Sequence, residues 1–201
     1  GGRTFWIAAG SEARCSLEAF ALDVLRLHAG EVGDWAGAEW WVQVKPCNLI
    51  TDDGSLADGA ASAIDLHYDK DEFLAERFSV GVYPQISTVT YITCGNSSSN
   101  LNHESGGDVY SNTAPTIVVD NTAALPVGRG MSRAFLSRPV VGKHIAFDGL
   151  YLHGVPSHKA LRKIHPFHSS ESPGIAENTE LDERLLVEKD QLRITILVNI
   201  W

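Results

Sequence analysis

The chain has 201 residues, of which 44% are hydrophobic and 20% charged, so its length and composition suit one globular domain spanning residues 1–201. Its net charge of -9 disfavours nonspecific binding to nucleic acids or membrane surfaces, which attract clustered basic residues. No apolar run approaches the roughly 20 residues of a membrane span. The three cysteines form no CxxC pair, which favours a reducing compartment. We therefore expect an intracellular, cytoplasmic protein with neither nucleic-acid nor membrane partners.

The first third of the chain predicts a strand, a helix and a second strand. Thr4 to Ala8 can form a short strand, and Ser11 to His28 has helical spacing. Ser11 can cap this helix and Gly30 can end it. The apolar stripe of the helix consists of Leu17, Phe20, Ala21, Val24, Leu25 and Leu27. From Glu39 to Pro46 the period changes to two, which predicts a strand.

The rest of the chain is dominated by short strand signals. A turn at residues 51–54 leads to a short strand from Ala63 to His67. Later segments rich in β-branched and aromatic residues are Ile86–Thr93, Thr116–Val119, Ala134–Val141, His144–Phe147, Tyr151–Val155 and Leu192–Trp201. This order predicts a mainly β (α+β) fold, a β-sandwich or jelly roll whose core covers residues 39–201, with the N-terminal helix supporting one side.

Two polar segments interrupt the strand pattern. Cys94 to Ala114 is rich in glycine, serine and asparagine, and His158 to Asp190 includes a predicted acidic helix at residues 178–188. Long segments of this kind in a compact domain are often lids or binding loops, and their composition equally allows disorder. Both segments, 94–114 and the 158–190 insertion, are therefore candidate lids.

The tripeptide His67-Tyr68-Asp69 and the later His153 are candidate metal ligands. In a strand, residues i and i+2 point the same way, so His67 and Asp69 can converge on one ion while Tyr68 points away. His153 follows an apolar strand and precedes Gly154, which permits a close approach of another backbone or a ligand. Two imidazoles and one carboxylate suit Fe(II). The tripeptide by itself is equally compatible with a strand-end histidine beside a surface aspartate.

The other histidines have simpler interpretations. Solvated side chains are expected for His28, His158, His165 and His168, whereas buried, hydrogen-bonded side chains are compatible with His103 and His144.

Arg193 lies near the start of the last strand, on the opposite face from Ile194, Ile196, Val198 and Ile200. A guanidinium that points into the fold has to meet an anion, either an internal carboxylate or the carboxylate of a ligand. The alternative is an arginine at a frayed strand end that faces water.

Taken in order, several motifs resemble the Fe(II)- and 2-oxoglutarate-dependent oxygenases, and most closely their prolyl-hydroxylase-like branch. These motifs are residues 67–72, 84–93, 114–116, 153–155 and 193–195, and the resemblance covers roughly Glu39 to Trp201. It implies a double-stranded β-helix with iron bound by His67, Asp69 and His153.

The same resemblance implies the residues that bind the cosubstrates. Arg193 would anchor the distal carboxylate of 2-oxoglutarate, assisted by Thr195, and Tyr91 matches a tyrosine that reaches the same carboxylate. A core tyrosine is an equally good interpretation of Tyr91. Because Arg193 follows His153 by more positions than is usual in the family, Arg162 and Lys163 compete with it on spacing; Arg193 is favoured by its place on an alternating strand.

The implied function is a hydroxylase that consumes O2 and 2-oxoglutarate, releases succinate and CO2, and oxidises a small-molecule or a peptide or protein substrate. Two other classes remain open: a cupin-type metalloenzyme that does not use 2-oxoglutarate, and a noncatalytic jelly-roll binding module.

Overall fold

The computed structural model describes residues 3–29, 34–46, 63–94, 114–122, 132–157 and 192–201. Several predictions fall outside these ranges. They concern the helix end at Gly30, the turn at 51–54, the body of the 94–114 loop, the 158–190 insertion with its acidic helix, His103, His158, His165, His168, and the rival anchors Arg162 and Lys163.

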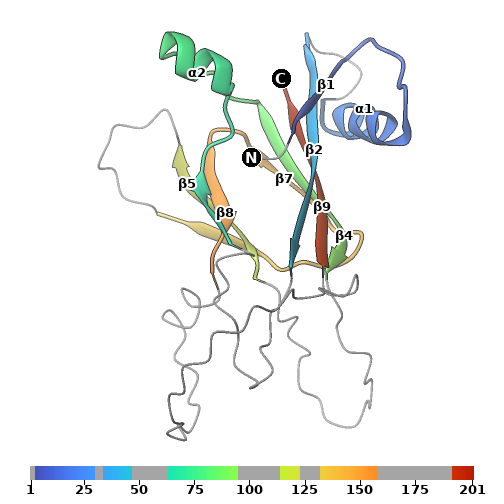
Figure 1. Ribbon diagram of the computed structural model, residues 1–201. Coiled ribbons are helices and arrows are strands. Elements are labelled where there is room, and N and C mark those ends of the chain that lie inside the picture. Colours follow the sequence, from blue (N-terminus) through green and yellow to red (C-terminus); the bar gives the residue numbers. More distant parts are fainter. Residues whose placement is uncertain (1–2, 30–33, 47–62, 95–113, 123–131, 158–191) are drawn as a thin grey trace, which may run out of the picture.

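The described residues form two antiparallel sheets that face each other (Figure 1). The five-stranded sheet has the order β1 (Phe5–Ala8), β2 (Gly37–Pro46), β9 (Leu192–Ile200), β4 (Ile86–Cys94) and β7 (His144–Asp148). The four-stranded sheet has the order β3 (Ile64–His67), β8 (Tyr151–Val155), β5 (Thr116–Thr122) and β6 (Ala134–Ser137). This sandwich confirms the predicted mainly β, jelly-roll type of fold.

The last strand lies inside the larger sheet, between two strands that come much earlier in the chain. β9 pairs with β2 on one side and with β4 on the other, and Tyr91 is the register partner of Thr195. In the smaller sheet, β3 pairs with β8 so that His67 lies opposite His153. These two registers bring together residues that are far apart in sequence.

The N-terminal helix α1 (Ser16–Ala29) packs against the outer face of the larger sheet, as predicted (Figure 1). Leu22 and Leu25 are buried there against apolar residues of β9, and Val198 and Ile200 are completely buried. Burial of each such aliphatic side chain contributes roughly 1.5–3 kcal/mol. The opposite face of β9 is therefore left to face the smaller sheet, in the interior of the sandwich.

The start of α1 differs from the prediction. The helix begins at Ser16, and Ser11 instead donates its backbone N–H to the carbonyl of Ala8 in a turn after β1. Leu27, predicted in the apolar stripe, is 71% exposed. The periodicity located the helix correctly, but a polar residue that can cap a helix can equally end a turn.

Two further boundaries were wrong or missed. β6 ends at Ser137 rather than at Val141, because Pro139 cannot donate to a strand ladder and Gly142 adopts a positive φ of 80° in a turn. The short helix α2 (Glu72–Phe78) was not predicted. Asp71 caps it by accepting from the N–H of Leu74 at 2.9 Å.

His28 and His144 join α1 to β7, which corrects the prediction of a solvated His28. Their Nε2 atoms are 2.8 Å apart while the ring centres are 5.1 Å apart, so the rings meet end to end across one shared hydrogen bond. The Nδ1 atom of His144 lies 2.6 Å from the hydroxyl of Thr90. His144 is thus hydrogen-bonded, as the sequence allowed.

This histidine pair should make the protein less stable in mild acid. Burial lowers the pKa of both rings, and the charge of His28 lowers the pKa of His144 further. Below about pH 6.5 the unfolded chain therefore takes up protons more readily than the folded protein. The free energy of unfolding consequently decreases as the pH is lowered. Urea unfolding at pH 5.5 to 7.5, followed by tryptophan fluorescence, should show a shallower pH dependence in His144→Gln than in the wild type. Equal slopes would contradict the assignment.

Candidate metal centre

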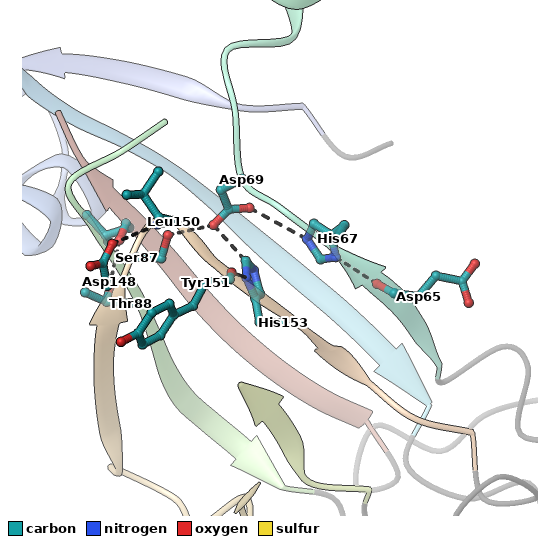
Figure 2. Close-up of polar contacts among 10 residues, drawn as sticks. Asp65, His67, Asp69, Ser87, Thr88, Asp148, Leu150, Tyr151 and His153 are labelled. Atoms are coloured by element: carbon teal, nitrogen blue, oxygen red, sulfur yellow. Dashed lines mark hydrogen bonds and ion pairs between the residues drawn. The ribbon is translucent and has the colours of Figure 1, made fainter. Parts of the chain in front are cut away.

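His67, Asp69 and His153 come together between the two sheets. His67 is the last residue of β3, Asp69 follows two positions later, and His153 lies in the middle of β8 (Figure 2). The carboxylate oxygens of Asp69 lie 3.6 Å from Nε2 of His67 and 3.5 Å from Nε2 of His153. The ligand atoms of all three residues are within 4.8 Å of one another, which is close enough to hold one metal ion.

Both histidines are oriented by backbone carbonyls. The Nδ1 atom of His67 lies 2.8 Å from the carbonyl oxygen of Asp65, and that of His153 lies 3.0 Å from the carbonyl oxygen of Tyr151 (Figure 2). When Nδ1 donates its proton to the carbonyl, Nε2 is directed at the aspartate, where it donates to the carboxylate in the protonated ring and offers a lone pair to a cation in the neutral ring. Each ring thus presents one ligand atom to the same point. The sequence could not identify these partners, because both are backbone atoms.

Asp69 is held by a residue that sequence reasoning missed. The hydroxyl of Ser87, on β4 of the other sheet, donates to the second carboxylate oxygen at 2.9 Å. Burial by itself would raise the pKa of Asp69, but the hydrogen bond and positive charge of His153, together with Ser87, lower it. Burial would likewise lower the pKa of His153, which the neighbouring Asp69 raises instead. Asp69 is therefore held as the charged carboxylate that a cation requires.

The three predicted cosubstrate residues line one interior pocket together with both histidines. Arg193 and Thr195 are each 3% exposed and Tyr91 is fully buried. The pocket has a volume of about 60 Å³ and also contacts Val89 and Leu197. Arg193 therefore points into the sandwich, and the alternative of a frayed strand end that faces water is wrong.

Two hydrogen bonds hold side chains that line this pocket. Nη1 of Arg193 donates to the carbonyl of Ala114 at 3.3 Å. The hydroxyl of Tyr91 lies 2.7 Å from that of Thr116, a lining residue that belongs to the 114–116 motif but was assigned no role from the sequence. The pocket therefore presents a guanidinium and three hydroxyl groups to whatever occupies it.

No protein-family model matches the chain, and the search of curated proteins finds no match. The fold and the site define a mainly β sandwich protein with a His-Asp-His group that can bind a metal ion. Within the described ranges this is the one such group of three or more residues. The same ranges contain no helix long and apolar enough to cross a membrane.

Proposed function

We propose that this protein is an Fe(II)- and 2-oxoglutarate-dependent oxygenase. The observation that supports the proposal is the composition of the interior pocket, in which His67 and His153 share the lining with Arg193. A metal ion on the histidines and Asp69 would bind one end of a dicarboxylate, and the guanidinium would bind the other. A metalloenzyme that did not use 2-oxoglutarate would have no need of this buried arginine.

Different residues of the chain would bind the metal ion and the cosubstrate. His67, Asp69 and His153 would hold the iron, with Ser87 fixing the carboxylate. Arg193 is pre-positioned by its bond to Ala114, so it would lose little side-chain freedom on binding the distal carboxylate.

Thr195 and Tyr91 lie opposite each other on β9 and β4 and would donate hydroxyl hydrogen bonds to the same carboxylate. Val89 and Leu197 would keep water away from it. When bound, iron with 2-oxoglutarate and O2 supplies the oxidising chemistry, in which succinate and CO2 are released and a substrate C–H bond is usually hydroxylated.

Anaerobic titration tests this proposal. Iron(II) followed by 2-oxoglutarate should produce a weak visible charge-transfer band in the wild-type protein. Arg193→Ala should need at least about tenfold more 2-oxoglutarate for the same band, because a buried charged contact to the cosubstrate is lost. Arg162→Ala, which removes the rival anchor, should behave as the wild type. A circular dichroism spectrum and an iron affinity equal to those of the wild type would show that Arg193→Ala is folded.

The contrary outcomes distinguish the other two classes. Iron binding without a band at any 2-oxoglutarate concentration would identify a cupin-type metalloenzyme. No iron binding would identify a noncatalytic binding module. If Arg162→Ala raised the 2-oxoglutarate requirement more than Arg193→Ala did, the residue that binds the distal carboxylate would lie in the 158–190 insertion.

A further inference from the structure

A second and larger hollow, the outer groove, also borders the metal-binding group. It has a volume of about 740 Å³ and is formed by β1, the first part of β2, the end of β9 and the segment that links β3 to α2. In Figure 1 the segment between β3 and α2 and the ends of β1, β2 and β9 lie in the same upper part of the view, where the C-terminus is also marked. His67 and Asp69 line this groove as well as the candidate metal site. A substrate lying in the groove would therefore reach the metal-binding group.

Aromatic rings form much of the lining of this groove. They belong to Phe5, Trp6, Trp41, Tyr68, Phe73 and Trp201. Trp6 is 48% exposed and Phe73 is 66% exposed. Aromatic faces attract cations as well as apolar groups, so the rings alone do not distinguish the two kinds of ligand.

The charged residues of the groove favour a cation. The lining contains Glu39, Asp69, Asp71 and Glu72, against a single basic residue, Lys70. Lys70 pairs with Glu72 at 3.4 Å, and Asp69 belongs to the metal-binding group, so the excess negative charge rests on Glu39 and Asp71. Burial and the nearby Asp69 and Asp71 raise the pKa of Glu39, against the opposing influence of Thr4 and Trp201. A cation placed beside Glu39 would relieve this unfavourable environment.

Asn199 provides an independent indication of a hydrogen-bond donor. Its side chain lines the same groove from β9 and is only 2% exposed. Its Oδ1 atom is buried and has no hydrogen-bond partner among the residues that the structure describes. A buried acceptor is normally satisfied, and here an N–H group of a ligand can satisfy it. Glu39 and Asn199 are register partners on β2 and β9, so both act on one part of the groove.

We infer that the groove binds an ammonium or guanidinium group of the substrate, with Glu39 as the counter-charge, Asn199 as the hydrogen-bond acceptor and the aromatic rings around it. Its role as a substrate site rests on the proposed oxygenase function. The substrate class is then an alkylamine or alkylguanidine, such as a lysine or arginine side chain. Neutral and anionic substrates would leave the Glu39 carboxylate without a counter-charge.

Tryptophan indole N–H signals in nitrogen-15 NMR spectra can test this binding directly. Trp6, Trp41 and Trp201 line the groove, whereas Trp35 packs against the core beneath α1 and serves as an internal reference. The probes are the Nα-acetyl N-methylamides of lysine, arginine, norleucine and glutamate. Lysine or arginine should shift the groove signals with at least about tenfold higher affinity than norleucine, and the better of the two identifies the cation.

Matched variants identify the residue responsible. Glu39→Gln should reduce the affinity for the cationic probe at least about fivefold and leave the affinity for norleucine unchanged. Glu76→Gln is the control, because Glu76 is exposed on α2 and does not line the groove. Equal affinities for the lysine, arginine and norleucine probes, or equal effects of the two variants, would overturn the inference.

The titration contains neither 2-oxoglutarate nor O2, and is repeated with zinc added. Its result is therefore separate from the test of the oxygenase. Cation preference without a charge-transfer band would support the binding site and remove its role in oxidation. A charge-transfer band without cation preference would overturn this inference and leave the oxygenase in place.

Discussion

Replacing His153 with alanine is expected to reduce the affinity for a divalent metal ion by more than about 100-fold. Loss of a partner that only orients a ligand already costs 10–100-fold, and here a ligand itself would be lost. His153 is 4% exposed and its Nε2 atom faces Asp69, so its loss would leave only His67 and Asp69 of the three ligand groups. Calorimetric titration with iron(II) under argon, or with zinc, measures this affinity.

His144→Ala is the matched control for His153→Ala. His144 likewise lies in a strand of the sandwich and is partly buried, but its Nε2 atom faces His28 rather than the metal-binding group. The His144→Ala variant should retain the metal affinity of the wild type. A metal ion should also raise the melting temperature of the wild type and of His144→Ala but not of His153→Ala, because binding to the folded state stabilises it. Unchanged metal binding in His153→Ala would exclude this site.

Gly154→Ala is expected to lower the free energy of unfolding by about 1–3 kcal/mol, the usual cost of forcing extra atoms into a packed site. A Cβ atom at Gly154 would lie 2.7 Å from the carbonyl oxygen of Ile64 and 3.0 Å from that of Asp65. The glycine was predicted to permit the close approach of a backbone or a ligand, and the backbone of β3 occupies this place.

The same substitution should also weaken metal binding by at least about tenfold. Relief of the contact has to move β3 away from β8, and β3 carries His67 and the carbonyl of Asp65 that orients its ring. Gly10→Ala is the control, because a Cβ atom there has nothing within 4 Å. Chemical unfolding and metal titration of both variants test the two effects. Wild-type metal affinity in Gly154→Ala would show that β3 can shift without moving His67.

The two hollows beside the metal-binding group differ in a way that fits the two proposals together. The interior pocket is small and contains the guanidinium of Arg193, which suits a compact anion. The outer groove is larger, aromatic and acidic, which suits a cation attached to a bulkier molecule. Opposite charges in the two hollows would direct the proposed cosubstrate and substrate to different places beside the same metal-binding group.

The sequence was sufficient for the features that depend on local spacing. The period of two in β9 correctly placed Arg193 and Thr195 opposite the apolar residues that pack beneath α1. The i, i+2 spacing of His67 and Asp69 made their convergence a reasonable hypothesis, and the order of the later motifs added His153. The mainly β fold followed from the number of short strands after a single helix.

Features created by pairing between distant strands were decided only by the tertiary structure. Ser87 reaches Asp69 from the other sheet, and Asn199 meets Glu39 because β9 pairs with β2. His28 was misread because its partner lies on a strand more than 100 positions later. The sequence by itself determines which face of a strand or helix a side chain occupies. Which side chains then meet depends on sheet order and register, which are set by long-range packing of the whole chain.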